Sequence, residues 1–165
     1  MSTSAARIRV LVLDVDGVLT DGRLYYGARG EALKVFHVRD GAGLKQLAAA
    51  GVTVAVISGR RSVMTRARCR ELGIRHVMQG VTDKAAALRR LCSRLRVTPA
   101  ECACVGDDTP DIPLMRLAGL AFAVADAHKQ ARQAAHRITT QPGGFGAVRE
   151  VCDQLLAARR GAETA

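Results

Sequence analysis

Short apolar runs alternate with longer amphipathic segments along most of this chain, and this alternation constrains its fold more than any other feature. Strands that alternate with helices form a parallel sheet with helices packed on both faces. We therefore expect an α/β fold, a three-layer α/β/α doubly wound parallel sheet. The expected strands are residues 8–15, 52–57, 76–78, 102–105, 121–124 and a short strand around Ile138, and the expected helices are residues 41–50, 62–72, 83–95, 110–117, 127–135 and 147–158.

The length of the chain bounds its domain organisation. A chain of 165 residues can bury one core but is too short for two ordinary domains, so residues 1–165 are expected as a single domain. Residues 24–26 and 32–37 flank the sequence Gly-Ala-Arg-Gly-Glu and predict a β-hairpin, a small flap over about residues 22–38. The chain leaves no room for a larger cap domain.

Several residues are of the types that favour helix ends. Asp40 and Asp83 are expected to cap the helices that follow them, and Thr98 and Glu101 have the spacing of a capping box. Residues 159–165 follow the last expected helix, so this tail is expected to fray.

The composition is strongly basic. A formal net charge of +10 and a pI of about 10.3 raise the possibility of a polyanionic partner such as nucleic acid. However, the basic residues are spread over several expected helices, and the chain has no Trp, two Tyr and three Phe with which to stack on bases. We therefore expect the charge to solvate helix faces and to steer small anionic substrates, with no nucleic acid partner.

The cysteines and the hydropathy pattern bear on where the protein works. The chain has five cysteines and no Cys-x-x-Cys pair, which favours reduced thiols over a disulfide framework or a zinc site. Its N-terminal sequence lacks the apolar segment of a signal peptide, and no apolar run approaches the roughly 18 residues of a membrane helix. We expect a cytoplasmic protein without membrane contact.

Aspartates cluster directly after two of the expected strands. Asp14 and Asp16 end the first strand, and Asp107 and Asp108 follow residues 102–105. Because ligands bind beyond the carboxyl ends of parallel strands, these carboxylates are expected at one edge of the sheet. Any one of them alone could instead start a turn or cap a helix. Together they repel one another unless they share a cation, and oxygen ligands without His or Cys favour Mg²⁺ over zinc.

Four motifs occur in order at or shortly after expected strand ends: DVDGVLTDG (14–22), ISGR (57–60), TDK (82–84) and GDDTPD (106–111). As a set they resemble the four motifs of the haloacid dehalogenase superfamily. The resemblance implies a phosphatase with an aspartyl-phosphate intermediate, which splits one difficult displacement into two easier steps. It assigns catalysis to Asp14 as nucleophile, Asp16 as general acid and then base, Ser58 and Lys84, and it assigns Mg²⁺ to Asp14, the backbone carbonyl of Asp16, Asp107 and Asp108, with Asp111 as a further ligand or support.

A narrower resemblance covers nearly the whole chain. FHVRDG (36–41), SGRRSVMTRARC (58–69) and GGFGAVREVC (143–152) closely resemble the capless phosphatases of 3-deoxy-D-manno-octulosonate 8-phosphate, a precursor of lipopolysaccharide. The resemblance implies a phosphosugar acid as substrate and a homotetramer in which the flap and the C-terminal loop contribute to neighbouring sites. It assigns substrate binding to Asp16, His37, Val38, Arg39, Asp40, Gly41, Lys45, Ser58, Gly59, Arg60, Arg68 and Lys84.

Two departures and several alternatives accompany this interpretation. Lys45 stands where the family usually has Arg, and Ser58 stands where Thr is common. Lysine cannot reproduce the bidentate grip of Arg on a carboxylate, so the preference among sugar acids is open. Related enzymes act on nine-carbon, sialic-acid-type 9-phosphates. A phosphomutase, a catalytically inactive subunit and a basic nucleic-acid-binding protein on the same fold are further alternatives.

Overall fold

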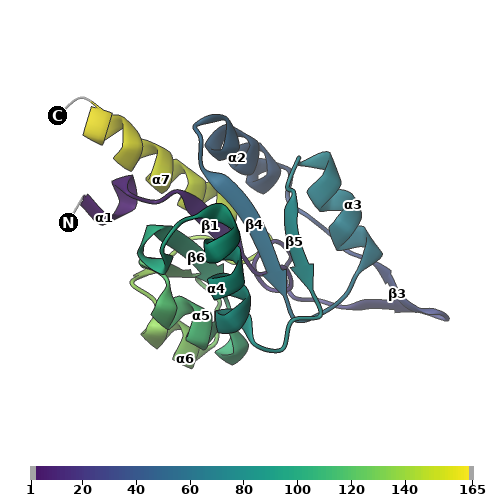
Figure 1. Ribbon diagram of the computed structural model, residues 1–165. Helices are drawn as coiled ribbons and strands as arrows, with labels where there is room; N and C mark the ends of the chain where they lie inside the picture. The colour runs from purple at the N-terminus through teal and green to yellow at the C-terminus, as the bar shows by residue number, and fades with distance from the viewer. Residues whose placement is uncertain (1–2, 164–165) are drawn as a thin grey trace.

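A six-stranded sheet forms the middle layer of the molecule (Figure 1). The computed structural model describes residues 3–163. The strand order is β5-β4-β1-β6-β7-β8, and all neighbouring strands are parallel, which confirms the expected doubly wound sheet. The strands are β1 (Val10–Leu13), β4 (Thr53–Ser58), β5 (His76–Gln79), β6 (Cys102–Gly106), β7 (Leu120–Ala123) and β8 (Arg137–Ile138).

Helices cover both faces of this sheet. Helices α2 and α7 pack together on one face, and α4, α5 and α6 pack in sequence on the other (Figure 1). No helix between residues 3 and 163 has both the length and the hydrophobicity that a membrane crossing requires. The helices are α1 (Thr3–Ala6), α2 (Val38–Ala49), α3 (Val63–Glu71), α4 (Lys84–Leu95), α5 (Ile112–Leu117), α6 (Lys129–Ala134) and α7 (Ala147–Glu163), with two 3₁₀ turns at Pro99–Glu101 and Thr109–Asp111.

The helix cap expected at Asp40 is wrong. His37, not Asp40, caps α2, because its Nδ1 accepts a hydrogen bond from the backbone N–H of Arg39 at 3.2 Å. Asp40 is buried instead, and its Oδ1 accepts a hydrogen bond from the backbone N–H of Arg149 at 2.8 Å, which ties α2 to the start of α7. The caps expected for Asp83 and the capping box at Thr98 are confirmed.

The C-terminal segment is more ordered than its polar sequence indicated. Helix α7 continues through Glu163, where fraying was expected from residue 159. Leu155 is buried in the core, and the guanidinium of Arg159 donates a hydrogen bond to the carbonyl of Ile8 at 3.3 Å. These contacts extend the helix, and the remainder of the expected frayed tail, residues 164–165, lies outside the described residues.

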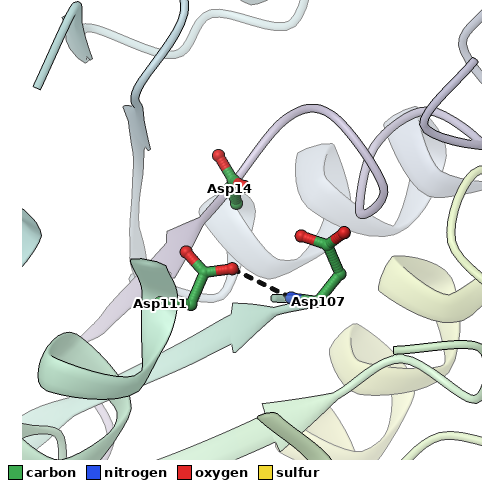
Figure 2. Close-up of side chains that lie close together, drawn as sticks. All are labelled: Asp14, Asp107 and Asp111. Carbon is green, nitrogen blue, oxygen red and sulfur yellow. Dashed lines mark hydrogen bonds between the residues drawn. The ribbon is translucent and has the colours of Figure 1, made fainter. Parts of the chain in front are cut away.

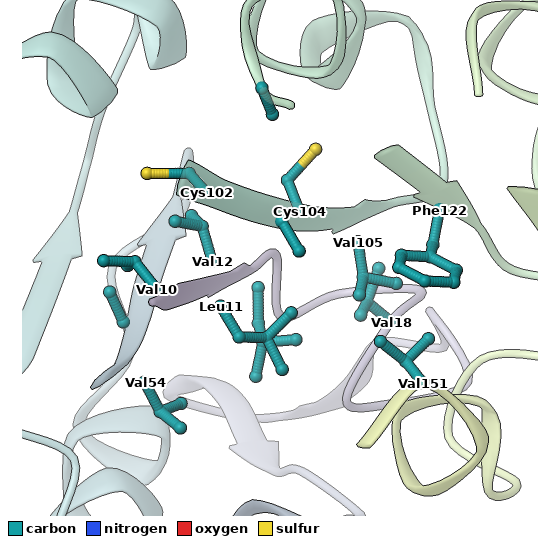
Figure 3. Packing of buried hydrophobic residues seen from close by; sticks show 14 of the residues in the cluster. Val10, Leu11, Val12, Val18, Val54, Cys102, Cys104, Val105, Phe122 and Val151 are labelled. Carbon is teal, nitrogen blue, oxygen red and sulfur yellow. The ribbon is translucent and has the colours of Figure 1, made fainter. Parts of the chain in front are cut away.

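The core is almost entirely aliphatic. All four residues of β1 are at most 1% exposed, and Phe122 is the aromatic ring in the buried cluster (Figure 3). Cys102 and Cys104 are fully buried on β6, and burial raises the pKa of the Cys104 thiol well above its usual range. Such thiols are unreactive, so they serve as small apolar side chains.

The flap is a short antiparallel hairpin that projects from the sheet (Figure 1). Its strands are β2 (Tyr25–Gly27) and β3 (Gly30–Leu33). The second strand was expected at residues 32–37 and begins earlier, because Glu31 pairs with Tyr26 across a tight turn. It also ends earlier, since Lys34 turns toward the sheet and contacts Asp16. Helix α2 follows directly, so no separate cap domain is inserted here.

Candidate active site

The sheet brings three aspartates together where the direction of strand succession reverses. Asp14 follows β1 and Asp107 follows β6, and these two strands are paired, with Leu13 opposite Val105. Asp111 comes from the 3₁₀ turn after β6. One carboxylate oxygen from each of Asp14, Asp107 and Asp111 lies within 4.8 Å of the others (Figure 2). This is the position at which doubly wound sheets bind ligands.

Lys84 provides the positive charge beside this cluster. It is the first residue of α4, and its side chain is 5% exposed. Its Nζ lies 3.1 Å from Asp14 Oδ1 and 2.5 Å from Asp111 Oδ1. Burial alone would lower the pKa of Lys84, but the adjacent Asp14 and Asp111 carboxylates outweigh it and raise that pKa. Lys84 is therefore a fixed cation at the end of β1.

Asp111 connects Lys84 to the loop that carries Asp107. While one carboxylate oxygen meets Lys84, Oδ2 accepts hydrogen bonds from the backbone N–H groups of Asp107 at 2.9 Å and Asp108 at 3.3 Å. Both oxygens are thus committed within the chain. Asp111 therefore fixes the position of Lys84 and of the loop that carries Asp107.

The cluster carries more negative charge than Lys84 balances. Burial, followed by repulsion from Asp111, raises the pKa of Asp14 to about 6. Burial, followed by repulsion from Asp14 and Asp111, raises the pKa of Asp107 to about 8. A divalent cation would relieve this repulsion, and a donor set made only of carboxylate oxygens suits Mg²⁺.

Asp16 and Asp108 lie outside this three-carboxylate cluster. The side chain of Asp16 contacts Lys34 and lies 3.6 Å from Arg60 Nε. Asp108 is exposed, and its Oδ1 accepts a hydrogen bond from the backbone N–H of Thr109 at 2.7 Å, so it caps the 3₁₀ turn. The structure thus gives Asp108 a local partner, and its role as a side-chain metal ligand stays a prediction.

All four residues predicted to be catalytic line one cavity of about 290 Å³: Asp14, Asp16, Ser58 and Lys84. Ser58 is the buried last residue of β4. Gly59 and Arg60 continue from it along the same cavity. A larger hollow of about 870 Å³ lies between α3, β5 and α4, but it is lined by arginines, Gln79 and apolar residues, without a carboxylate. The chemistry of the lining residues, and not the volume of the cavity, therefore identifies the site.

The remaining residues predicted to bind substrate do not line this cavity. Arg68 pairs with Glu71 at 2.9 Å and lies over the ring of Phe36 at 6.0 Å, and it packs closely against Gly41. Lys45 is exposed on α2. The residues in this group are His37, Val38, Arg39, Asp40, Gly41, Lys45 and Arg68.

Glycine is required where the first motif turns. Gly17 has φ +86°, a conformation that side chains rarely adopt, and a Cβ there would collide with the carboxylate of Asp107. The C-terminal loop then packs on the same turn, where Gly144 N–H donates a hydrogen bond to the Val18 carbonyl at 3.0 Å. This close packing holds the Asp107 side chain beside Asp14.

Two flap residues that contact residues of the site were not expected from the sequence. Lys34 contacts Asp16 and lies 2.8 Å from Glu31, and Glu31 also lies 3.6 Å from Arg60. The sequence signal was an acid and a lysine three residues apart, with Glu31 in the expected turn of the hairpin and Lys34 in its expected second strand. Their contact with a residue before the hairpin follows only from the fold.

Comparisons with known proteins agree with this geometry. Residues 71–148 match the family described as haloacid dehalogenase-like hydrolase. The chain is 48% identical over 155 residues to 3-deoxy-D-manno-octulosonate 8-phosphate phosphatase of Yersinia pestis, which covers 94% of this chain and 83% of that protein. A crystal structure of the Yersinia pestis phosphatase has a TM-score of 0.94 at 46% identity and covers 98% of this chain and 88% of that one.

A second solved structure is similar along nearly its whole length. The 3-deoxy-D-manno-octulosonate 8-phosphate phosphatase of Moraxella catarrhalis, in complex with a magnesium ion, a phosphate ion and a KDO molecule, has a TM-score of 0.94 at 41% identity. The match covers 99% of this chain and 94% of that chain.

Proposed function

This chain belongs to the haloacid dehalogenase-like hydrolases, and within them to the 3-deoxy-D-manno-octulosonate 8-phosphate phosphatases, and we propose that Asp14 is the nucleophile of that reaction. The protein is a Mg²⁺-dependent phosphoric monoester hydrolase that converts 3-deoxy-D-manno-octulosonate 8-phosphate to the free sugar acid and phosphate. The observation that carries the proposal is the Asp14, Asp107 and Asp111 cluster with Lys84 in contact with two of its members.

Asp14 attacks phosphorus in the first step. Its pKa of about 6 leaves the carboxylate ionised at neutral pH, as a nucleophile must be. Lys84, 3.1 Å away, offsets the repulsion between this carboxylate and an incoming phosphate dianion. The bond between phosphorus and the C8 oxygen breaks as the bond to Asp14 forms.

Asp16 moves the proton in both steps. As the C8 oxygen leaves, Asp16 gives it a proton, so that an alcohol and not an alkoxide departs. The resulting Asp16 carboxylate then takes a proton from water, which attacks phosphorus and breaks the bond to Asp14. The cavity that Asp14 and Asp16 line together supports this division of roles.

The acidic cluster fits a bound Mg²⁺ through Asp14 and Asp107, with the backbone carbonyl of Asp16 as a further oxygen. When bound, Mg²⁺ supplies positive charge that stabilises the transferring phosphoryl group. Ser58 is positioned to donate a hydrogen bond to a phosphoryl oxygen from the end of β4. Asp111 keeps Lys84 and the Asp107 loop in place.

Recognition of the sugar acid is expected to use the cations around the cavity. Arg60 is 42% exposed and lies beside Asp16, so it is the cavity residue best placed to meet a distant carboxylate. Arg68 and Lys45 lie farther along α3 and α2. A neutral phosphosugar would lack the charge-assisted contact that the sugar acid's carboxylate makes with these residues, at a cost of about 1.5 to 3 kcal/mol.

A homotetramer is proposed to complete the site. The flap exposes Leu24, Tyr25, Tyr26, Leu33 and Val35, of which Tyr26 is 66% exposed. An exposed apolar patch of this kind is typical of a protein interface. Phe145 in the C-terminal loop is also exposed, which supports a contribution of this loop to a neighbouring site.

The single-domain organisation over residues 1–165 and a cytoplasmic location are also proposals. One continuous buried cluster that includes residues from both α1 and α7 supports the first. Five free, buried cysteines are consistent with a reducing compartment and support the second.

The function is tested by phosphate release from a panel of phosphosugars with and without Mg²⁺. We expect 3-deoxy-D-manno-octulosonate 8-phosphate to be preferred over glucose 6-phosphate by at least about tenfold in kcat/KM, the equivalent of about 1.4 kcal/mol. Arg60→Ala or Arg68→Ala should reduce this preference, because each change should lower kcat/KM for the sugar acid phosphate more than for glucose 6-phosphate. A nine-carbon sugar acid 9-phosphate belongs in the panel, and its preference over the eight-carbon substrate would overturn the proposed substrate.

A further inference from the structure

Lys34 is a buried charge that the reaction described above does not use. It follows strand β3 of the flap, and its side chain is 1% exposed. It contacts Asp16 Oδ1 and lies 2.8 Å from Glu31 Oε1. Burial of an ammonium group is unfavourable unless partners compensate it, so the two carboxylates hold Lys34 in this position.

The two partners of Lys34 come from different parts of the chain. Glu31 belongs to the flap, whereas Asp16 belongs to the turn after β1, 18 residues before Lys34. Lys34 therefore fastens the flap to the side chain of Asp16 within one chain. Arg60 reinforces this link from the sheet side, since it lies 3.6 Å from both carboxylates.

The contact also determines which oxygen of Asp16 is available. Oδ1 is held by Lys34, while Oδ2 lies 3.6 Å from Arg60 Nε, which is beyond hydrogen-bond distance. Asp16 and Arg60 line the cavity, whereas Lys34 does not. Lys34 thus contacts Asp16 without lining the cavity, which leaves Oδ2 as the oxygen that can meet the substrate.

We propose that Lys34 is a positioning residue that holds Asp16 in the orientation from which it protonates the leaving oxygen of the substrate. The inference rests on the proposed role of Asp16 as general acid. It makes the flap part of the proton-transfer machinery of its own chain, in addition to any cover it gives a neighbouring site. Glu31 acts one step farther away, as the anchor that holds Lys34.

The prediction is a selective loss of rate. A misplaced general acid slows departure of an alkoxide, which needs the proton, and spares 4-nitrophenolate, which leaves without one. General acid catalysis contributes about 10²-fold or more, and a displacement of about 1 Å can remove much of that contribution. For Lys34→Met we therefore expect first-turnover release of the sugar acid to slow by about 10 to 100-fold, and release of 4-nitrophenol from 4-nitrophenyl phosphate to slow by less than about threefold.

The experiment measures leaving-group release in the first turnover by rapid quench, with enzyme in excess over substrate and saturating Mg²⁺. The first turnover isolates transfer to Asp14 from the later hydrolysis, which is common to both substrates. Glu31→Gln should show the same selectivity with a smaller loss, because it retains the contact between Lys34 and Asp16. Lys129→Met, on the exposed side of α6, is the matched control and should leave both rates unchanged.

The outcomes separate this inference from the proposed function. Equal slowing of both substrates by Lys34→Met would overturn the positioning role and indicate general damage to the site, and unchanged rates would overturn it as well. Retained 4-nitrophenol release by Lys34→Met also shows that the variant is folded and that Asp14 is active. Failure of the proposed function would instead appear in the wild-type protein, as absence of Mg²⁺-dependent release from either substrate.

Discussion

The aspartate cluster and the flap are held in place by different forces, although Asp16 lies two residues after Asp14 of the cluster and contacts Lys34 of the flap. Asp14 and Asp107 extend from strands whose residues are fully buried, so packing of the core fixes them. The flap exposes its apolar residues and is linked to the sheet by ion pairs of Lys34 and Arg60. We therefore expect phosphoryl transfer to depend on the core, and the flap to adjust proton transfer and access to the site.

The largest expected effect is at the centre of the buried region. Asp14→Asn replaces the nucleophile by an amide and removes a charged metal ligand, so phosphate release should fall below about a hundredth of the wild-type rate. The circular dichroism spectrum should be unchanged, because the side chain keeps its shape. A higher residual rate would show that the chemistry does not pass through Asp14.

The next largest effect is expected from Asp111, which holds Lys84 and the Asp107 loop in place. Asp111→Asn leaves Lys84 with one carboxylate partner and weakens the hold on the Asp107 loop, so we expect kcat to fall by about 10 to 100-fold. Loss of one partner from a buried pair should also lower the free energy of unfolding by up to about 3 to 5 kcal/mol. Asp153→Asn, at an exposed ion pair on α7, is the control. If Asp111→Asn changed kcat and the free energy of unfolding as little as Asp153→Asn does, Asp111 would not have the supporting role.

A smaller effect is expected from the apolar side of the flap. Leu33→Glu with Val35→Glu places charge where the tetramer interface is proposed, but it should cost little stability within one chain because both side chains are exposed. Sedimentation should show smaller species, and kcat/KM should fall by about tenfold, or about 1.4 kcal/mol. Val63→Glu, an exposed change on α3, is the control and should alter neither the sedimentation nor kcat/KM. A flap variant that is still a fully active tetramer would argue against this interface.

The smallest effect is a pH dependence of stability in the metal-free protein. Because the folded state raises the pKa of Asp14 to about 6 and of Asp107 to about 8, it retains protons that the unfolded state releases from pH about 4 upward. The free energy of unfolding should therefore fall as pH rises from about 4 to 8. In EDTA, we expect the Tm to drop by at least about 4 °C from pH 6 to pH 8, which corresponds to about 1 to 2 kcal/mol. Mg²⁺ should reduce the drop, and Asp107→Asn should diminish it in EDTA.

The contrast between the core strands and the flap also explains which features could be predicted from the sequence. Strands are read from local apolar runs, and motif residues at strand ends meet because the parallel topology brings their ends to one edge. For this reason the doubly wound sheet was predictable, and Asp14, Ser58 and Lys84 could be assigned to one site. Their position at or just after strand ends is enough to predict that these residues share one cavity.

Contacts between distant segments were not predictable in this way. Asp40 comes just before glycines and has the local pattern of a helix cap, but it lies within α2, and its carboxylate accepts a hydrogen bond from the backbone N–H of Arg149 in the first turn of α7. Lys34 lies in an expected strand with no sign of a function, and only the folded flap brings it to Asp16. The distinction between Asp108 and Asp111 likewise depends on the 3₁₀ turn, which directs Asp111 inward and leaves Asp108 exposed.

The central claim is that the phosphoryl group passes through a covalent bond to Asp14. It is tested most directly by mass spectrometry of Asp16→Asn after incubation with 3-deoxy-D-manno-octulosonate 8-phosphate and Mg²⁺, because this variant lacks the base that activates water. We predict one added phosphoryl group, located on the peptide that contains Asp14 and absent from the double variant with Asp14→Asn. A phosphoryl group on another residue, or phosphate release at the wild-type rate without an adduct, would contradict the account.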